Sequence, residues 1–467
     1  MPLYRESNFL VVHPGSQETL FSFGLQESLS PPRYKISSVV YQDPSTKEYK
    51  SSKTSSDQKE IYPIQKSRIV DIDAFNFLLR TVLGKVIEDN PLVTINQIPL
   101  LLVVPSLTWT RSQIEQITKY VIESLEFTAF NIFDSSLATT FGMNTLNCAC
   151  VIDVGREATQ IVPLVGSQKI KFAGRYLKDI GSQVLNKELK KSLPDFSEKQ
   201  IEALKTSGIF EFITSQENTF YSISDLLNVE KNEESDEFDV AKVVSSNNGA
   251  VGDKEGTEGE NDEENEHKEN SQLEKNYFLD PDTKEKIYVG KERFQVSSEL
   301  IDVVSDAVHL SLSRIPDLAR RQECYDNLIF VGSTFKIPGL KQALLLKLSS
   351  DYLIKPSSEA NAEAQNAGVN STILAYQQAD DNLEIGEDIN MGFYQVPSSI
   401  RPAKHPDYFP EWKQPKNQGG SWEHVYILGA EIYAKQIFTG NSNHAELYID
   451  SDIYHDRGAQ GIWDVTI

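Results

Sequence analysis

Apolar residues gather in short runs that predict two β-hairpins. The runs lie at 8–13 and 19–24 around Pro14-Gly15-Ser16, and at 148–154 and 159–166 around Gly155-Arg156-Glu157. Short apolar runs on either side of a glycine-containing polar turn are typical of hairpins. At a constant offset of 140 residues, VVHPGSQET (11–19) and VIDVGREAT (151–159) share the same order of apolar, polar, glycine and threonine positions. The match indicates an internal repeat, with chance similarity between two hairpins as the alternative.

Apolar positions three and four residues apart predict helices between the strands. Over 71–88 they are Ile72, Phe75, Leu78, Leu79, Val82 and Val86. A helix over 112–125 opens with Ser112-Gln113-Ile114-Glu115, a capping-box pattern in which Ser112 caps the helix. Strand 98–104, helix 112–125, strand 127–133 and helix 134–142 alternate, and strand 327–332 with helix 339–348 repeats that order. This alternation predicts an α/β fold with parallel strand pairs.

The acidic charge is concentrated in one segment. The 467 residues carry a net charge of −23, and residues 230–270 alone contribute −11 from 15 acidic and 4 basic side chains. This stretch has too few apolar residues to offset its ordering entropy, so a disordered acidic insert is expected over about 230–275. It is either a solvated loop or an arm that attracts basic partners such as histones. The polar segment 351–395 is expected to be a flexible loop insert.

Several classes of function are excluded by composition. A strongly acidic chain lacks the clustered basic surface that direct nucleic-acid binding needs. The longest apolar run, 98–104, is far shorter than a membrane span. Three cysteines cannot form a paired disulfide framework, which favours a reducing compartment. We expect Cys148 and Cys150 to face opposite sides of their strand, and with no second pair and no nearby histidine we expect no metal site.

Five stretches, taken together and in order, resemble the actin superfamily of actins, Hsp70 chaperones and sugar kinases. They are YPIQKSRIVDIDAFNFLL (62–79), VIDVGREATQIVPLVG (151–166), YVGKERFQVSSEL (288–300), NLIFVGSTFKIPGL (327–340) and HVYILGAEIYAKQIF (424–438). The acidic insert, KHPDYFPEWK (404–413) and GIWDVTI (461–467) are most similar to the divergent fungal actin-related proteins of chromatin remodellers.

The resemblance implies an actin-like, ribonuclease H-like duplicated fold of two lobes. The first lobe would span 1–147 and the second 148–350, including the acidic insert. The loop insert 351–395 would follow, and a C-terminal segment, 396–467, would return to the first lobe.

The nucleotide site implied by the resemblance has lost most of its chemistry. His13 stands where the family has an acidic residue, Leu20 where it has a phosphate lysine, Asp134 where a glutamine positions water, and Gln160 where it has a histidine. Pro14 offers no amide donor, and Glu157 adds charge and a side chain where a triphosphate would approach. We therefore expect no catalytic residue and no cofactor. The residues that remain in this vestigial cleft are Gly15, Ser16, Asp153, Gly155, Gly332 and Thr334.

The family's role without catalysis would be that of a scaffold. The resemblance implies pairing with a second actin-related protein and binding of a basic helical segment of the motor ATPase, in the nucleus. Candidate groove residues are Leu137, Thr140, Phe141 and Met143, with a packed core as an equal alternative. Tyr408, Phe409 and Trp412 form either a surface anchor or a packed loop. The other function left open is a nucleotide-dependent switch or ATPase in which Arg156 replaces the lost lysine.

Overall fold

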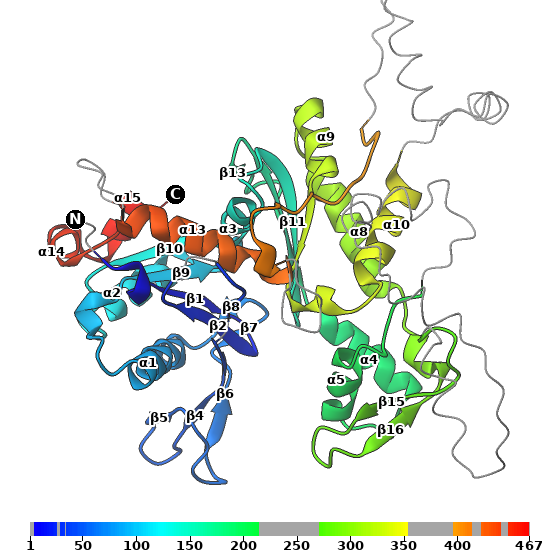
Figure 1. Ribbon diagram of the computed structural model, residues 1–467, viewed down its shortest axis with the longest axis horizontal. Coiled ribbons are helices and arrows are strands. Elements are labelled where there is room, and N and C mark those ends of the chain that lie inside the picture. Colours follow the sequence, from blue (N-terminus) through cyan, green and yellow to red (C-terminus); the bar gives the residue numbers. More distant parts are fainter. Residues whose placement is uncertain are drawn as a thin grey trace, which may run out of the picture.

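The computed structural model describes residues 4–25, 29–32, 34–213, 270–353, 396–412, 422–439 and 447–466. Most of the two expected inserts, 230–275 and 351–395, therefore lies outside the described residues. Two larger sheets organise the molecule (Figure 1). We call each sheet with the helices that cover it a lobe, numbered in chain order.

The first sheet has the strand order β10-β9-β1-β2-β3. Its strands are β1 (Leu10–Pro14), β2 (Glu18–Phe23), β3 (Tyr34–Ser37), β9 (Leu100–Val104) and β10 (Phe130–Asp134). The second sheet has the order β13-β12-β11-β17, with β14 also paired to β12. Its strands are β11 (Cys148–Val154), β12 (Ala158–Val165), β13 (Gln168–Lys169), β14 (Arg175–Lys178) and β17 (Leu328–Val331).

The repeat expected from the two hairpins is present in the strand pairing. β1 pairs antiparallel with β2 and parallel with β9, and β11 pairs antiparallel with β12 and parallel with β17. In the first turn the Gly15 amide donates to the Glu18 carbonyl over 3.1 Å, and in the second the Gly155 amide donates to the Ala158 carbonyl over 3.0 Å. The two turn bonds lie 140 residues apart, at the offset of the sequence match. Two hairpins with the same partners argue against chance similarity.

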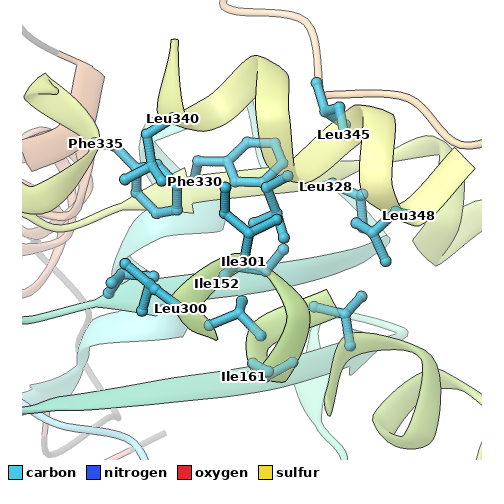
Figure 2. Packing of buried hydrophobic residues seen from close by; sticks show 14 of the residues in the cluster. Ile152, Ile161, Leu300, Ile301, Leu328, Phe330, Phe335, Leu340, Leu345 and Leu348 are labelled. Atoms are coloured by element: carbon cyan, nitrogen blue, oxygen red, sulfur yellow. The ribbon is translucent and has the colours of Figure 1, made fainter. Parts of the chain in front are cut away.

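Each sheet has an outer face that is covered by helices of its own lobe. The first sheet packs against α1 (Ile72–Asp89), α2 (Arg111–Glu123) and α15 (Ile462–Val465) through side chains such as Phe75, Ile117 and Ile462. The second packs against α8 (Glu299–Leu312), α9 (Leu318–Asp326) and α10 (Leu340–Tyr352), where Ile301 and Leu345 lie over Ile152 and Phe330 (Figure 2).

A pair of helices, α3 (Ser135–Gly142) and α13 (Val425–Thr439), fills the space between the two sheets (Figure 1). One hydrophobic cluster contains Val11 and Leu101 of the first sheet, Val151 of the second, Ala138 of α3 and Leu428 of α13. The helix pair thus joins both lobes, and we call this cluster the apolar seam.

The remaining described elements extend each lobe. The first lobe carries β4 (Val40–Gln42), β5 (Tyr49–Lys50), β6 (Lys59–Ile61), and the hairpin of β7 (Ile64–Gln65) and β8 (Arg68–Ile69). The second carries α4 (Ser182–Ser192), α5 (Glu198–Thr206), β15 (Asn276–Leu279) and β16 (Lys286–Val289).

The C-terminal segment contacts both lobes. Its last part, with α14 (Ser451–Arg457), lies on the first lobe, where the Asn131 side chain donates to the carbonyls of Leu447 and Val465. Residues 396–403 instead run beside β17 of the second lobe, where the Leu328 amide donates to the Arg401 carbonyl over 3.0 Å.

Two local predictions were wrong. Cys148 and Cys150 lie on the same side of β11, in one buried cluster with Cys324, because residues two apart on a strand share a face. The capping box of α2 begins at Thr110, whose hydroxyl accepts from the Gln113 amide, and not at Ser112. Thr110-x-x-Gln113 satisfies the same pattern two residues earlier, and the helix starts at this first pair.

Candidate functional site

The second hairpin and the loop after β17 bring four of the six predicted cleft residues together. Gly332 has φ 102°, and a Cβ there would lie 2.5 Å from the Val154 carbonyl and 3.0 Å from Asp153 Oδ1. The Thr334 hydroxyl donates to the Gly155 carbonyl over 3.1 Å. These contacts give Gly332 and Thr334 a clear role in holding the loop on the turn.

The other two, Gly15 and Ser16, lie in the turn of the first hairpin. A Cβ at Gly15 would lie 2.5 Å from the Glu18 carbonyl, so the close turn requires a glycine there. Next to this turn the His13 ring packs on Tyr426 of α13, with ring centroids 4.3 Å apart. Burial raises the pKa of Tyr426, and the charges of Asp153 and Glu423 add to this effect.

Burial controls the protonation of the groups around Tyr426. It lowers the pKa of His13 to about 4 and that of His424 to about 3, and it raises the pKa of Asp153 to about 7. His424 Nδ1 lies 2.9 Å from the Tyr426 hydroxyl. Two of the side chains in contact with Tyr426 are thus imidazoles, whereas a magnesium ion prefers oxygen ligands.

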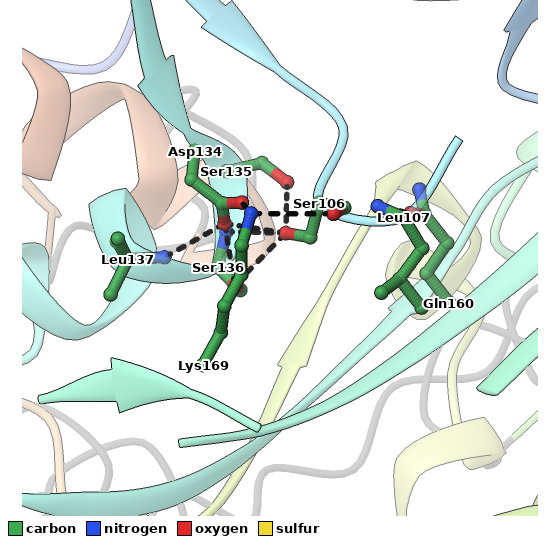
Figure 3. A network of polar contacts seen from close by, with 8 residues as sticks. All are labelled: Ser106, Leu107, Asp134, Ser135, Ser136, Leu137, Gln160 and Lys169. Carbon is green, nitrogen blue, oxygen red and sulfur yellow. Dashed lines mark hydrogen bonds and ion pairs between the residues drawn. The ribbon is translucent and has the colours of Figure 1, made fainter. Parts of the chain in front are cut away.

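Asp134 is the centre of a polar network (Figure 3). It ends β10 and caps α3, accepting from the amides of Ser136 and Leu137. Its carboxylate also accepts from the hydroxyls of Ser106 and Ser136 over 2.6 Å each and forms an ion pair with Lys169 of β13. Burial alone would raise the pKa of Asp134, but Lys169 and the two hydroxyls outweigh it and hold the pKa below its usual value.

The Asp134–Lys169 ion pair crosses from the first lobe to the second, and it has neighbours that do the same. Lys169 also donates to the Ser106 carbonyl over 3.4 Å. The buried Gln160 side chain of β12 accepts from the Leu107 amide over 3.0 Å (Figure 3). Asp134 and Gln160, which the resemblance places at the family's glutamine and histidine positions, are thus both engaged in contacts between the lobes.

Glu157 makes a third crossing, at the tip of the β7–β8 hairpin. Its carboxylate accepts from the Lys66 amide over 2.8 Å, and the Tyr176 hydroxyl donates to the Lys66 carbonyl over 2.7 Å. The Lys66 ammonium pairs with Asp179, and the Arg68 guanidinium lies 4.8 Å from the Tyr176 ring centroid. We call all these crossings the polar seam: Lys66, Arg68, Ser106, Leu107 and Asp134 with Glu157, Gln160, Lys169, Tyr176 and Asp179.

Comparison with known proteins agrees with this architecture. The Actin family model matches residues 4–375. The chain belongs to the actin family. The fold class expected from sequence, an α/β actin-like fold, is therefore confirmed.

Among curated relatives, this actin-family chain is 24% identical over 552 residues to the protein named SWI/SNF and RSC complexes subunit arp9 of Schizosaccharomyces pombe. The alignment covers 99% of each chain. This relative confirms the narrower resemblance to actin-related protein 9 within the family.

Three of the four groove candidates are core residues in this actin-family chain. Leu137, Thr140 and Met143 are buried, and only Phe141 is partly exposed, with its ring edge against Phe133 and Tyr433. The cause is the close crossing of α3 and α13. The buried three therefore offer no surface to a helical partner, and the packed-core alternative holds for them.

The aromatic cluster divides between surface and interior. Trp412 is 1% exposed, and its indole nitrogen donates to the Leu29 carbonyl over 3.0 Å. Phe409 is half-buried, whereas Tyr408 is 77% exposed. A surface anchor is thus possible at Tyr408 but not at Trp412.

The sequence identified Asp134, Glu157 and Gln160 as substitutions but missed their partners Lys66, Ser106 and Lys169. Lys169 lies in a short polar turn strand, and nothing in its neighbourhood signals an ion pair with a residue 35 positions earlier. Among the described residues, no helix is long and apolar enough to cross a bilayer, and no three acidic, histidine or cysteine side chains converge as a metal site.

Proposed function

We propose that this chain is a non-catalytic scaffold subunit of a nuclear chromatin-remodelling complex. It pairs with a second actin-related protein and binds a helical segment of the motor ATPase. The likeness to a SWI/SNF and RSC subunit supports the type of complex. The single observation that carries the loss of catalysis is the engagement of Asp134 by Lys169, because a carboxylate held in an ion pair is not free to orient water.

Calorimetric titration of the purified chain with Mg-ATP tests the catalytic part of this proposal. We expect no heat of binding at micromolar nucleotide and no phosphate release. Micromolar binding with turnover would contradict a purely structural role.

Co-purification tests the partners. Expressed with a second actin-related protein and the motor ATPase, the chain should be recovered with both. Tyr408→Ala removes the exposed aromatic candidate, and Tyr288→Ala, at a tyrosine 59% exposed on β16, is the matched control. A loss of partner specific to Tyr408→Ala supports an anchor there. Equal recovery with both variants excludes Tyr408 as an anchor, and failure to recover either partner contradicts the scaffold.

The second candidate function is a nucleotide-dependent switch. One observation favours it: Arg156 Nε is buried and has no hydrogen-bond partner among the described residues. A phosphate group could satisfy this nitrogen. Arg156→Met tests this candidate. Loss of nucleotide binding in the variant would support a role for Arg156, and unchanged binding would contradict it.

The acidic insert lies outside the described residues, and a role in histone binding stays a prediction. Deletion of 230–270 followed by measurement of nucleosome affinity tests it, and unchanged affinity excludes it. No direct nucleic-acid contact is proposed for the body of the protein.

A further inference from the structure

We propose that the polar seam fixes the relative position of the two lobes without any nucleotide between them. In this interpretation Asp134, Glu157 and Gln160 are positioning residues. Each contacts the opposite lobe and thereby replaces the bridge that a ligand between the lobes would otherwise supply. The inference concerns the chain alone, and only its purpose, a preformed surface for partners, rests on the proposed scaffold function.

The crossings are distributed in a way that restricts rotation. On the first lobe they start from three separate places: the β7–β8 tip, the segment after β9, and the end of β10. On the second they end on the β11–β12 turn and on β12, β13 and β14. Because hydrogen bonds are short and directional, several that are satisfied together at separated points allow only one relative orientation.

The Asp134–Lys169 pair is the strongest crossing. The Asp134 side chain is 6% exposed and that of Lys169 is 22% exposed, so water screens the pair poorly. If the lobes separated at this point, a mostly buried carboxylate would lose its cation, which is a costly change. The two serine hydroxyls and the α3 amides hold the carboxylate in place on its own lobe.

The β7–β8 tip makes several contacts with the opposite lobe. Lys66 and Ser67 have φ of 52° and 59°, the left-handed conformation that a two-residue turn between paired strands requires. The backbone of Lys66 donates to Glu157 and accepts from Tyr176, and its ammonium pairs with Asp179. Three contacts from one residue thus join this turn to the second lobe.

The apolar seam alone would not give the same restriction. The helix pair α3–α13 lies between the sheets and acts as a connection about which the lobes can turn, whereas the polar seam extends from the N-terminus of α3, capped by Asp134, to the β7–β8 tip (Figures 1 and 3). Two connections at different places define an orientation, and one does not.

Spin labels on the outer ends of the lobes test this inference in the full chain. Glu48→Cys, in the region of β4 and β5, and Glu285→Cys, between β15 and β16, are both exposed, while the three natural cysteines are buried. We expect one narrow distance distribution that millimolar Mg-ATP does not shift. Lys169→Met with Glu157→Ala should remove the narrow peak, and Lys191→Met, which breaks a Glu188 pair within α4, should not.

A broad distribution in the parent, a shift with Mg-ATP, or a narrow peak that survives in the double variant would each overturn the inference. If the double variant does not fold, Tyr176→Phe and Glu157→Ala as single changes remain available, since both side chains are only half-buried. Hydrogen exchange then supplies the measurement: the amides of Lys66 and Leu107 should exchange about two- to fivefold faster, the effect of about 0.5–1 kcal/mol.

The two proposals fail in different ways. Binding of Mg-ATP with phosphate release and an unshifted label distance contradicts the non-catalytic role and leaves the polar seam intact. Absence of binding with a broad distance distribution contradicts the polar seam and leaves the scaffold role intact.

Discussion

The apolar seam and the polar seam join the same two lobes by opposite means. In the first, α3 and α13 approach so closely that backbone touches backbone: a Cβ on Gly429 would lie 1.7 Å from the Ala138 carbonyl, and one on Gly142 would lie 2.6 Å from the Val425 carbonyl. In the second, side chains of opposite charge and matching hydrogen-bond type meet across the lobes. Close packing tolerates no added atom, while polar contacts can be removed one at a time.

The two seams also differ in the residues that form them. Asp134, Glu157 and Gln160, which the resemblance places at a nucleotide site, have partners on the opposite lobe, whereas Gly142 and Gly429 lie at the helix crossing. A backbone contact permits few replacements, but a polar side chain facing another lobe can take up a new partner.

The largest expected effect comes from a substitution that separates the two helices of the apolar seam. Gly429→Ala places a methyl group inside the α3 backbone, so the helices must separate, and we expect the free energy of unfolding to fall by more than about 3 kcal/mol. Gly84→Ala is the control, because it is exposed in α1 with no atom within 4 Å of its added Cβ. It should stabilise by about 0.5–1 kcal/mol. Chemical denaturation measures both, and a tolerated Gly429→Ala would contradict the close crossing.

The second largest expected effect comes from removing the cation of the polar seam. Lys169→Met leaves the buried Asp134 carboxylate with hydroxyl and amide partners only, and we expect a loss of about 2 kcal/mol. Adding Asp134→Asn to Lys169→Met should recover part of this loss, since the uncompensated charge disappears. A double-mutant cycle gives the coupling between the two residues, and additive losses would show that they do not interact.

The two seams should respond to pH with opposite signs. Burial raises the pKa of Glu431 of α13 to about 7, so its charged form is disfavoured in the folded state. Its contribution to stability is present in acid and is lost as the pH rises from about 4.5 to about 7. The lowered pKa of Asp134 does the reverse: its contribution is present above the unfolded-state pKa and is lost as the pH falls below about 4.

Thermal or denaturant unfolding at pH 5 and pH 8 measures this contrast. The free energy of unfolding of Glu431→Gln, measured relative to that of the parent, should rise by about 2 kcal/mol from pH 5 to pH 8. A stability difference between Glu431→Gln and the parent that does not change with pH would mean that Glu431 ionises normally in the folded chain.

The smallest expected effect comes from removing one hydrogen bond at the edge of the polar seam. Tyr176→Phe removes the hydroxyl that donates to the Lys66 carbonyl, and we expect a loss of about 0.5–1 kcal/mol. Tyr408→Phe, at a tyrosine 77% exposed, is the matched control and should stay within about 0.5 kcal/mol of the parent. Equal effects in the two variants would show that the Tyr176 hydroxyl does not stabilise the contact between the lobes.

The sequence predicted what depends on local pattern. The period of apolar residues located α1, whose buried side chains include Phe75, Leu79 and Val82, and the turn residues located both hairpins. Local pattern also has ambiguities: two overlapping capping boxes fit the start of α2, and only the one at Thr110 forms.

Contacts between distant parts of the chain were not predictable in this way. Leu137 and Thr140 have the spacing of either a surface stripe or a core stripe, and only the position of α13 decides between them. The resemblance to actins points to Asp134, but the charge of this residue alone does not reveal whether a cation, a hydroxyl or water compensates it. The partner comes from the other lobe, which no local pattern describes.

The place of α13 in the chain has a consequence for synthesis. Helix α3 ends at residue 142, but the helix that covers it begins only at residue 425. At about 5–20 residues per second, a ribosome needs roughly 15–60 s to make the stretch between them. For that time α3 and the inner face of the first sheet lack this cover, because α13 has not yet been made. The contacts of α13 with both lobes can form only when translation is nearly complete.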